Sequence, residues 1–179
     1  ICSLAFKNCI NLIKIIIDPY QTKLENNSFM NCTSLNHLEF LFTVNSVEKI
    51  DSDNFSQITE ITIPDTVTSI QDESFSKCSK LEALTLNPFS IKVTPKSFDN
   101  CNSLNHLKFP SYFTSIGRID YNNYIKFTVI TIPSSVTKIE DYAFSECSSI
   151  TEIRVPSSVK HIGISAFSEC RSLTKITIP

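Results

Sequence analysis

Seven cysteines and three histidines are the residues of this chain with the most versatile chemistry. Both types can bind zinc, but zinc sites usually bring two ligands close together in the sequence, as in C-x-x-C, and this chain has no such pair. His37 and His106 occupy the same position of a repeated pattern, three repeats apart, and His161 occupies a different position. The three histidines therefore do not converge on one ion, and we expect neither a metal site nor a cofactor.

Six cysteines occupy the same position of a 23-residue repeat, namely Cys9, Cys32, Cys78, Cys101, Cys147 and Cys170. One repeated position indicates that each thiol is a small, buried hydrophobic group. The alternative is a disulfide between neighbouring repeats, whose α-carbons would lie about 5 Å apart, although the β-carbon separation would strain that bond. Cys2 lies outside the series, so we expect it to be the exposed, reactive thiol.

The same 23-residue spacing organises the whole chain. Counting from Phe6 in steps of 23 meets Phe six times and Tyr once in eight positions. Nine and eleven residues later come apolar pairs such as Ile61/Ile63 and Ile153/Val155. Seven of the eight pairs enclose a polar residue, and Pro follows the pair in five repeats. This alternation predicts one half-buried strand per repeat, which the proline ends because it donates no hydrogen bond.

Two further segments complete each repeat. A second apolar pair, for example Val136/Ile139, predicts another short extended segment. The stretch 165–173 has apolar residues three apart, which suits one helical or 3₁₀ turn. A single repeat could not bury its apolar side alone, so we expect the repeats to stack as coils of a solenoid.

Residues 121–179 follow the pattern F-x-x-C-x-x-[LI]-x-x-I-x-[IV]-P-x-x-V-x-x-I-x-x-x-[SA]-F almost without a break. This pattern resembles the BspA-like leucine-rich repeat of treponemal type, and the resemblance covers essentially the whole chain. It implies an α/β repeat fold: a leucine-rich-repeat solenoid with a parallel β-sheet, short helical or 3₁₀ turns and about 7.5 coils of 23 residues. Residues 1–179 would form one such solenoid. The pattern departs at Leu41 and Asn87, where proline is usual.

A longer period overlies the first. Residues 28–40 and 97–109 are identical at ten of thirteen positions, a shift of three coils. The same shift carries 61–64 onto 130–133, both of which read Ile-Thr-Ile-Pro. The sequence therefore indicates that a three-coil unit was duplicated.

The resemblance implies a non-enzymatic binding module, because proteins with this repeat are commonly surface or secreted proteins that act in adhesion to host or matrix proteins. The alternative is an intracellular scaffold or regulator that holds a cytosolic or nuclear partner through the same surface. A solenoid sheet suits either role, since it presents a long, repetitive surface to a protein partner.

The composition excludes several other classes. A net charge of -2 without a basic stripe argues against nucleic-acid binding. Two glycines cannot form a nucleotide-binding loop, and no apolar run approaches the roughly 20 residues that span a bilayer. No Ser or Cys stands in a recognisable nucleophile motif with His and an acid, so we expect no catalytic residue.

The candidates for partner contact occupy repeat positions at which the residue type differs from coil to coil, whereas other positions of the repeat keep one type. They are Tyr20, His37, Glu39, Phe89, His106, Lys108, Tyr112 and Arg154. Aromatic and arginine side chains often dominate interfaces. The alternative for the three aromatic residues is packing over coils that lack the strand-ending proline, and for the two histidines it is simple exposure to solvent.

Two expectations concern modification and assembly. Asn26, Asn31 and Asn54 head N-x-[ST] triplets, which would permit N-glycosylation in a secretory pathway. The chain starts and stops within a coil, which favours a fragment of a longer array. We also expect that open ends without polar caps could associate end to end.

Overall fold

The structure, a computed structural model, describes residues 1–25, 27–48, 50, 54–76, 78–120, 124 and 127–179. Contacts between α-carbons divide the chain into two compact units, residues 1–84 with 90–104, and residues 85–89 with 105–179. Each unit consists of stacked coils that pair through short parallel strands. The predicted parallel-strand solenoid is confirmed, whereas a single domain over residues 1–179 stays a prediction.

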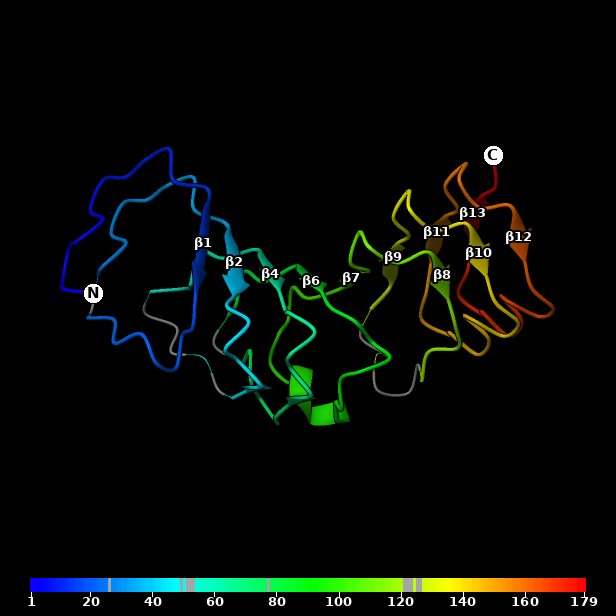
Figure 1. Cartoon of the computed structure of the whole chain (residues 1–179), viewed down its shortest axis with the longest axis horizontal. Coiled ribbons are helices and arrows are strands. Elements are labelled where there is room, and N and C mark those ends of the chain that lie inside the picture. The colour runs from blue at the N-terminus through cyan, green and yellow to red at the C-terminus, as the bar shows by residue number, and fades with distance from the viewer. Residues whose placement is uncertain (26, 49, 51–53, 77, 121–123, 125–126) are drawn as a thin grey trace. The chain divides into compact units, whose positions relative to one another are not determined.

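In the first unit each coil contributes one strand to a parallel sheet (Figure 1). The strands follow one another in chain order as β1 (Lys14–Ile17), β2 (His37–Phe40), β4 (Glu60–Thr62) and β6 (Ala83–Thr85). A second ladder joins β3 (Ser46–Val47) to β5 (Ser69–Ile70), and the helix η1 (Pro95–Phe98) is of 3₁₀ type. Residues in register are 23 apart, as in Lys14 opposite His37, so one coil of sequence advances the structure by one strand.

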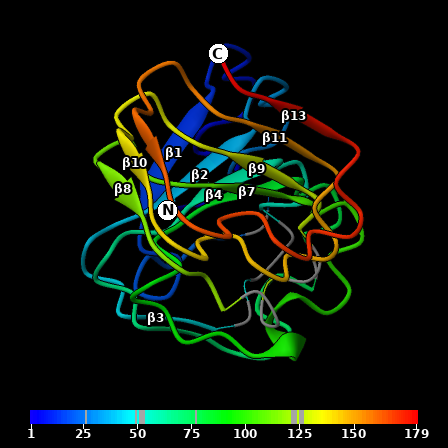
Figure 2. The same ribbon diagram turned by 90° about the vertical axis from the view of Figure 1, so that its right-hand side faces the viewer.

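The second unit repeats this arrangement. Its main sheet is built of β7 (His106–Lys108), β9 (Val129–Thr131), β11 (Glu152–Arg154) and β13 (Lys175–Thr177), all parallel. The second extended segment of each coil forms another ladder of β8 (Ser115–Ile116), β10 (Lys138–Ile139) and β12 (His161–Ile162). Figure 2 shows β8 and β10 apart from the main sheet of this unit. Both predicted strands of the repeat are therefore present.

The core of each unit is a set of apolar columns that run from coil to coil. Inward strand residues are buried in the inner coils: Leu38, Ile61, Leu107 and Ile153 have no exposed surface, whereas Ile176 of β13 is 40% exposed. Fully burying one such side chain stabilises a fold by about 1.5–3 kcal/mol. The coils therefore hold one another through nearest-neighbour contacts.

Buried serines explain why the residue before the repeated aromatic position is small. Ser74 donates its hydroxyl to the carbonyl of Val47 at 2.8 Å, and Ser97 donates to the carbonyl of Ile70 at 2.8 Å. Both serines are fully buried. Each one satisfies a carbonyl group of the preceding coil, and a larger side chain would not fit there.

The predicted helical or 3₁₀ turn is an α-helix nowhere among the described residues; η1 forms a 3₁₀ helix, and Tyr124 also has 3₁₀ conformation. Elsewhere the turn consists of single hydrogen bonds, such as Ser168 N–H to the Ser165 carbonyl at 3.1 Å. Left-handed residues explain the interruption, because Ser165 has φ 52° and Glu169 has φ 58°. A helix cannot propagate through such residues.

Left-handed backbone recurs two residues after the repeated aromatic position, with Asn at φ 62°, 60° and 62° in three coils and Glu146 at φ 65°. Asn tolerates this conformation better than Glu. We expect Glu146→Asn to raise the free energy of unfolding by about 0.5–1 kcal/mol. Glu146→Ala is the control, since it removes the same exposed carboxylate, 3.7 Å from Arg118, without relieving the backbone. Equal melting temperatures for the two variants would contradict this account.

Two glycines occupy the same repeat position two coils apart, and neither has a positive φ. A β-carbon on Gly163 would press on the backbone nitrogen of Asp141 and lie 2.6 Å from the carbonyl carbon of Glu140, whereas one on Gly117 would meet only Phe89 at 4.0 Å. We expect Gly163→Ala to lower the free energy of unfolding by about 1–3 kcal/mol. Gly117→Ala should raise it by up to about 1 kcal/mol. Urea unfolding checks both, and a similar loss in the two variants would refute the steric explanation.

The cysteine series is buried in the middle of the chain but not at its ends. Cys32, Cys78, Cys101 and Cys147 are buried, and all seven cysteines are free thiols. The prediction of a buried ladder was wrong for Cys9, which is exposed, and Cys170 is half-buried. The coils of these two residues have a described neighbour on one side only, so one face stays uncovered. Cys2 is exposed, as expected.

The structure also corrects one of the three expected glycosylation sites. Asn54 is only 5% exposed. Its side-chain oxygen accepts a hydrogen bond from Ser28 N–H at 3.1 Å, and its side-chain NH₂ donates one to the Glu25 carbonyl at 3.2 Å. A buried amide with both polar atoms engaged cannot accept a glycan in the folded chain. Asn31 is exposed and donates to Asn8 at 3.0 Å, and Asn26 lies outside the described residues.

Within the described part of the chain, no helix has the length and apolar character to cross a bilayer.

Candidate protein-binding face

Alternation along each short strand places two side chains per coil on the outward face of the sheet. In the second unit these residues form what we call the second-unit face: His106, Lys108, Val129, Thr131, Glu152, Arg154, Lys175 and Thr177. All eight are half-buried or exposed. The corresponding first-unit face consists of Lys14, Ile16, His37, Glu39, Glu60 and Thr62.

The same hydrogen bond recurs on both faces. His37 Nε2 lies 2.8 Å from Thr62 Oγ1, and His106 Nε2 lies 2.7 Å from Thr131 Oγ1. Each pair links one coil to the next, and its two members are 25 residues apart. The duplication of the three-coil unit has therefore copied both partners. The histidines are half-buried and hydrogen-bonded, not simply solvated as one reading of the sequence held.

Ion pairs differ between the two faces. On the first-unit face Lys14 pairs with Glu39. On the second-unit face Glu152 accepts from Arg154 Nε and lies the same distance, 3.1 Å, from Lys175 Nζ. The hydrogen bonds from Arg154 and then Lys175 lower the pKa of the Glu152 carboxyl, so it stays ionised at neutral pH. This carboxylate orients two cations on neighbouring strands.

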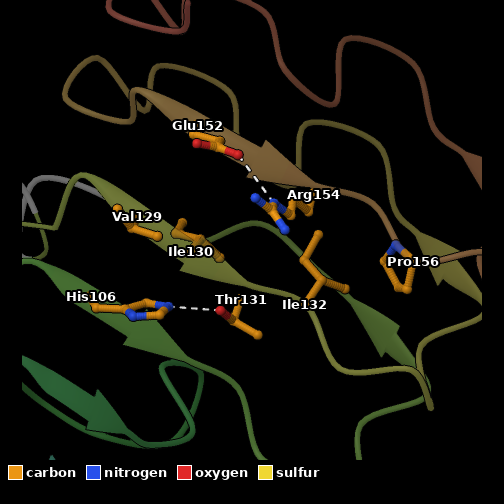
Figure 3. A pocket seen from close by; sticks show the side chains of 8 residues that line it. All are labelled: His106, Val129, Ile130, Thr131, Ile132, Glu152, Arg154 and Pro156. Carbon is orange, nitrogen blue, oxygen red and sulfur yellow. Dashed lines mark hydrogen bonds and ion pairs between the residues drawn. The ribbon is translucent and has the colours of Figure 1, made fainter. Parts of the chain in front are cut away.

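A hollow of about 430 Å³ lies on the second-unit face, and we call it the β9 hollow. His106 and Thr131 line one side, and Glu152 and Arg154 line the other (Figure 3). The hollow exists because Val129 and Thr131, the two outward residues of β9, have shorter side chains than the outward residues of β7 and β11. It is open to solvent and lined by both donors and acceptors.

Tyr20 lies on the turn after β1, where its ring meets Phe40 edge-on at a centroid distance of 6.4 Å. Its hydroxyl donates to the Glu48 carbonyl at 2.9 Å and accepts from Glu48 N–H at 2.8 Å. Burial raises the pKa of this phenol, so it stays protonated. Tyr20 therefore packs against its own coil and the next one, although 38% of its surface is exposed.

Phe89 and Tyr112 meet through a third ring in the second unit. Phe113 lies 5.7 Å from Phe89 and 5.2 Å from Tyr112, measured between ring centroids. Phe109, which is buried, lies 5.7 Å from Phe113 and connects this cluster to the core. Phe89 and Tyr112 are still 45% and 56% exposed, so they serve packing and also present aromatic surface.

The candidate residues thus fall into separate groups. The second-unit face brings together His106, Lys108 and Arg154, and the first-unit face brings together His37 and Glu39. Glu152 and Lys175, which lie on the second-unit face, are not among the candidates that the sequence indicated. The signal was available, because residues i and i+2 of a strand share one face.

Burial also affects the reactivity of the inward thiols. Burial raises the pKa of the Cys78 thiol to about 12, which keeps it from acting as a nucleophile near neutral pH. Within the described ranges no group of three or more His, Cys, Asp and Glu residues is placed to hold a metal ion. The arrangement on the second-unit face supports recognition through hydrogen bonds, charge and shape.

Comparisons with solved structures find bacterial leucine-rich repeat proteins. The chain is 25% identical to a Treponema pallidum leucine-rich repeat protein, with a TM-score of 0.43, over 68% of this chain and 59% of that one. It is 25% identical to a Bacteroides ovatus leucine-rich repeat protein, with a TM-score of 0.40, over 99% and 52%. A leucine-rich cell surface protein from Faecalibacterium prausnitzii gives 24% identity and 0.39, over 93% and 47%. The chain thus spans about half the length of these proteins.

No curated protein matches the chain. A family profile for the BspA type leucine-rich repeat region, which contains six copies of the repeat, matches residues 1–118 and again residues 84–179. The two matches together cover every coil, in agreement with the repeat length, the parallel sheets and the outward faces described above. Repeats of this kind typically serve as protein-interaction modules. The chain belongs to the BspA-type leucine-rich repeat family.

Proposed function

We propose that the chain is a non-enzymatic protein-binding module whose partner contacts the outward face of its sheet. One observation carries this proposal: inward residues such as Leu107 and Ile153 are uniformly apolar and buried, whereas outward residues change in charge and size from coil to coil. Stability requires only the inward columns. Variation on the outward side is free to serve recognition, and the second-unit face adds a hollow with polar groups on both sides.

The test compares two bulky substitutions at exposed positions of the second unit. Thr131→Trp fills the β9 hollow, and Lys160→Trp adds the same ring beside β12, away from the outward side of the main sheet. We expect Thr131→Trp to weaken binding to a partner at least ten-fold and Lys160→Trp to leave it within two-fold. Purified matrix and host-surface proteins, immobilised for interferometry, are the first panel. Equal binding by both variants would refute the proposed face.

We further propose that the protein acts at the cell surface or after secretion, in adhesion to a host or matrix protein, as the family resemblance implies. Antibody labelling of intact and then permeabilised source cells tests this location. Labelling of intact cells supports adhesion, whereas labelling only after permeabilisation contradicts it.

An intracellular scaffold is the second candidate, and a specific observation favours it. All seven cysteines are free, and exposed Cys2 and Cys9 would suit a reducing compartment. In that case the same face would hold a cytosolic or nuclear protein. The labelling experiment separates the two candidates, because only the intracellular one requires permeabilised cells.

A further inference from the structure

The two outward faces carry opposite charge. The second-unit face has three cations, Lys108, Arg154 and Lys175, and one carboxylate, Glu152, among its described residues. The described residues of the first-unit face include one cation and two carboxylates. The duplicated segments differ at this point, since Glu39 of the first copy corresponds to Lys108 of the second. A basic face on a chain of net charge -2 is a local feature that composition alone conceals.

Arg154 lines the β9 hollow, and Lys108 stands on the strand on the other side of Thr131. Lys108 and Arg154 both lie in register with Thr131, one on each neighbouring strand. Parallel strands are about 4.8 Å apart, so these two residues stand on strands about 10 Å apart with the short side chain of Thr131 between them. A group that enters the hollow therefore has Arg154 and Glu152 on one side and the His106–Thr131 pair on the other.

Arg154 is placed to bind an anion from solvent. Its guanidinium uses Nε to reach Glu152, and its side chain remains 77% exposed. A guanidinium has five N–H donors in a planar fork, so the contact to Glu152 orients the group and leaves donors for a ligand. Lys175, 59% exposed, lies on the other side of Glu152. Glu152 thus orients two cations on this face, Arg154 at the hollow and Lys175 beyond it.

We propose that the second-unit face binds an acidic, extended segment of the partner protein, with one carboxylate of that segment at the β9 hollow beside Arg154. The inference rests on the proposed function and names the chemistry of the partner. In a polyproline II segment every third residue points to the same side, about 9.3 Å further on. The second carboxylate then lies over β13, two strands beyond the hollow, beside Lys175.

The probe is a fluorescently labelled peptide of repeated Glu-Pro-Ala triplets, with Gln-Pro-Ala as its neutral counterpart. Anisotropy titrations at low salt are expected to show at least ten-fold tighter binding of the Glu peptide. Arg154→Glu should weaken this binding at least ten-fold, and Lys160→Glu, the same size of charge change away from the face, should alter it less than two-fold. Binding should also weaken as salt rises.

Glu152→Gln provides a change in the opposite direction. This substitution removes the one negative charge among the described residues of the second-unit face and leaves the cations in place. The Glu peptide should therefore bind several-fold tighter. Unchanged or weaker binding would show that Glu152 does not compete with the ligand. Circular dichroism of each variant confirms that the fold is retained.

The outcomes separate this inference from the proposed function. Equal affinity for the Glu and Gln peptides, or no effect of Arg154→Glu, overturns the acidic segment. If Thr131→Trp still blocks a protein partner while Arg154→Glu does not, the face binds protein by other chemistry and the proposed function stands. If neither variant affects a partner, the proposed function fails as well.

Discussion

Phe75→Ala is expected to lower the free energy of unfolding by about 3–5 kcal/mol. Phe75 has no exposed surface and stacks on Phe98, the same position of the next coil, with ring centroids 6.2 Å apart and an interplanar angle of 6°. Removing the ring creates a cavity and also breaks the stack between two coils. Because each coil is stabilised mainly by its neighbours, the loss weakens the coils on both sides.

Phe42→Ala is the matched control in the same unit. Its ring is 72% exposed, so its removal should change the free energy of unfolding by no more than about 0.5 kcal/mol. Urea unfolding followed by circular dichroism measures both variants. Similar losses for the two, or a loss below about 1 kcal/mol for Phe75→Ala, would contradict the buried aromatic stack.

The free energy of unfolding is expected to fall steeply as the pH rises above 9. Burial raises the pKa of Cys78 from 9.0 to about 12, and burial likewise raises the pKa of Cys147. Between these values the unfolded chain loses a proton that the folded chain retains, so alkali favours unfolding. Each such thiol removes about 1.4 kcal/mol per pH unit. The stabilisation is complete below pH 9 and is lost as the pH approaches the folded value.

Urea unfolding at several values between pH 8 and pH 11 measures this slope. Cys78→Ala removes one titrating thiol and should reduce the slope above pH 9 by about 1.4 kcal/mol per pH unit, besides a constant loss from the cavity. A free energy of unfolding that stays constant over this range would refute the burial of these thiols.

The strands could be predicted because two periods coincide in the sequence. A strand alternates inward and outward residues, and stacking repeats that alternation once per coil, so Ile61 and Ile153 are marked by type as well as by spacing. The second extended segment was marked in the same way by pairs such as Val136/Ile139. Residue types sufficed here because the same inward position recurs from coil to coil.

The contacts of the faces were less predictable. His37 hydrogen-bonds Thr62, and His106 hydrogen-bonds Thr131, across a separation of 25 residues, which is two more than one coil. Such a hydrogen bond between residues that are not directly opposite each other depends on side-chain length and on which rotamer reaches the next strand. The ion pairs of Glu152 depend on the same geometry. The sequence shows that such residues recur but not which of them meet.

By itself, the sequence determined the repeat length, the parallel sheets, the apolar columns and the family, because these follow from residue types that recur at a fixed spacing. Only the tertiary structure decided that Asn54 is buried with its amide satisfied, that Cys9 is exposed and that the turns contain left-handed residues instead of helix. It also placed His106 and Thr131 on one side of a hollow and Glu152 and Arg154 on the other. The physical reason is that burial and pairing depend on which neighbouring coil covers a residue, and that information is spread over residues far apart in the chain.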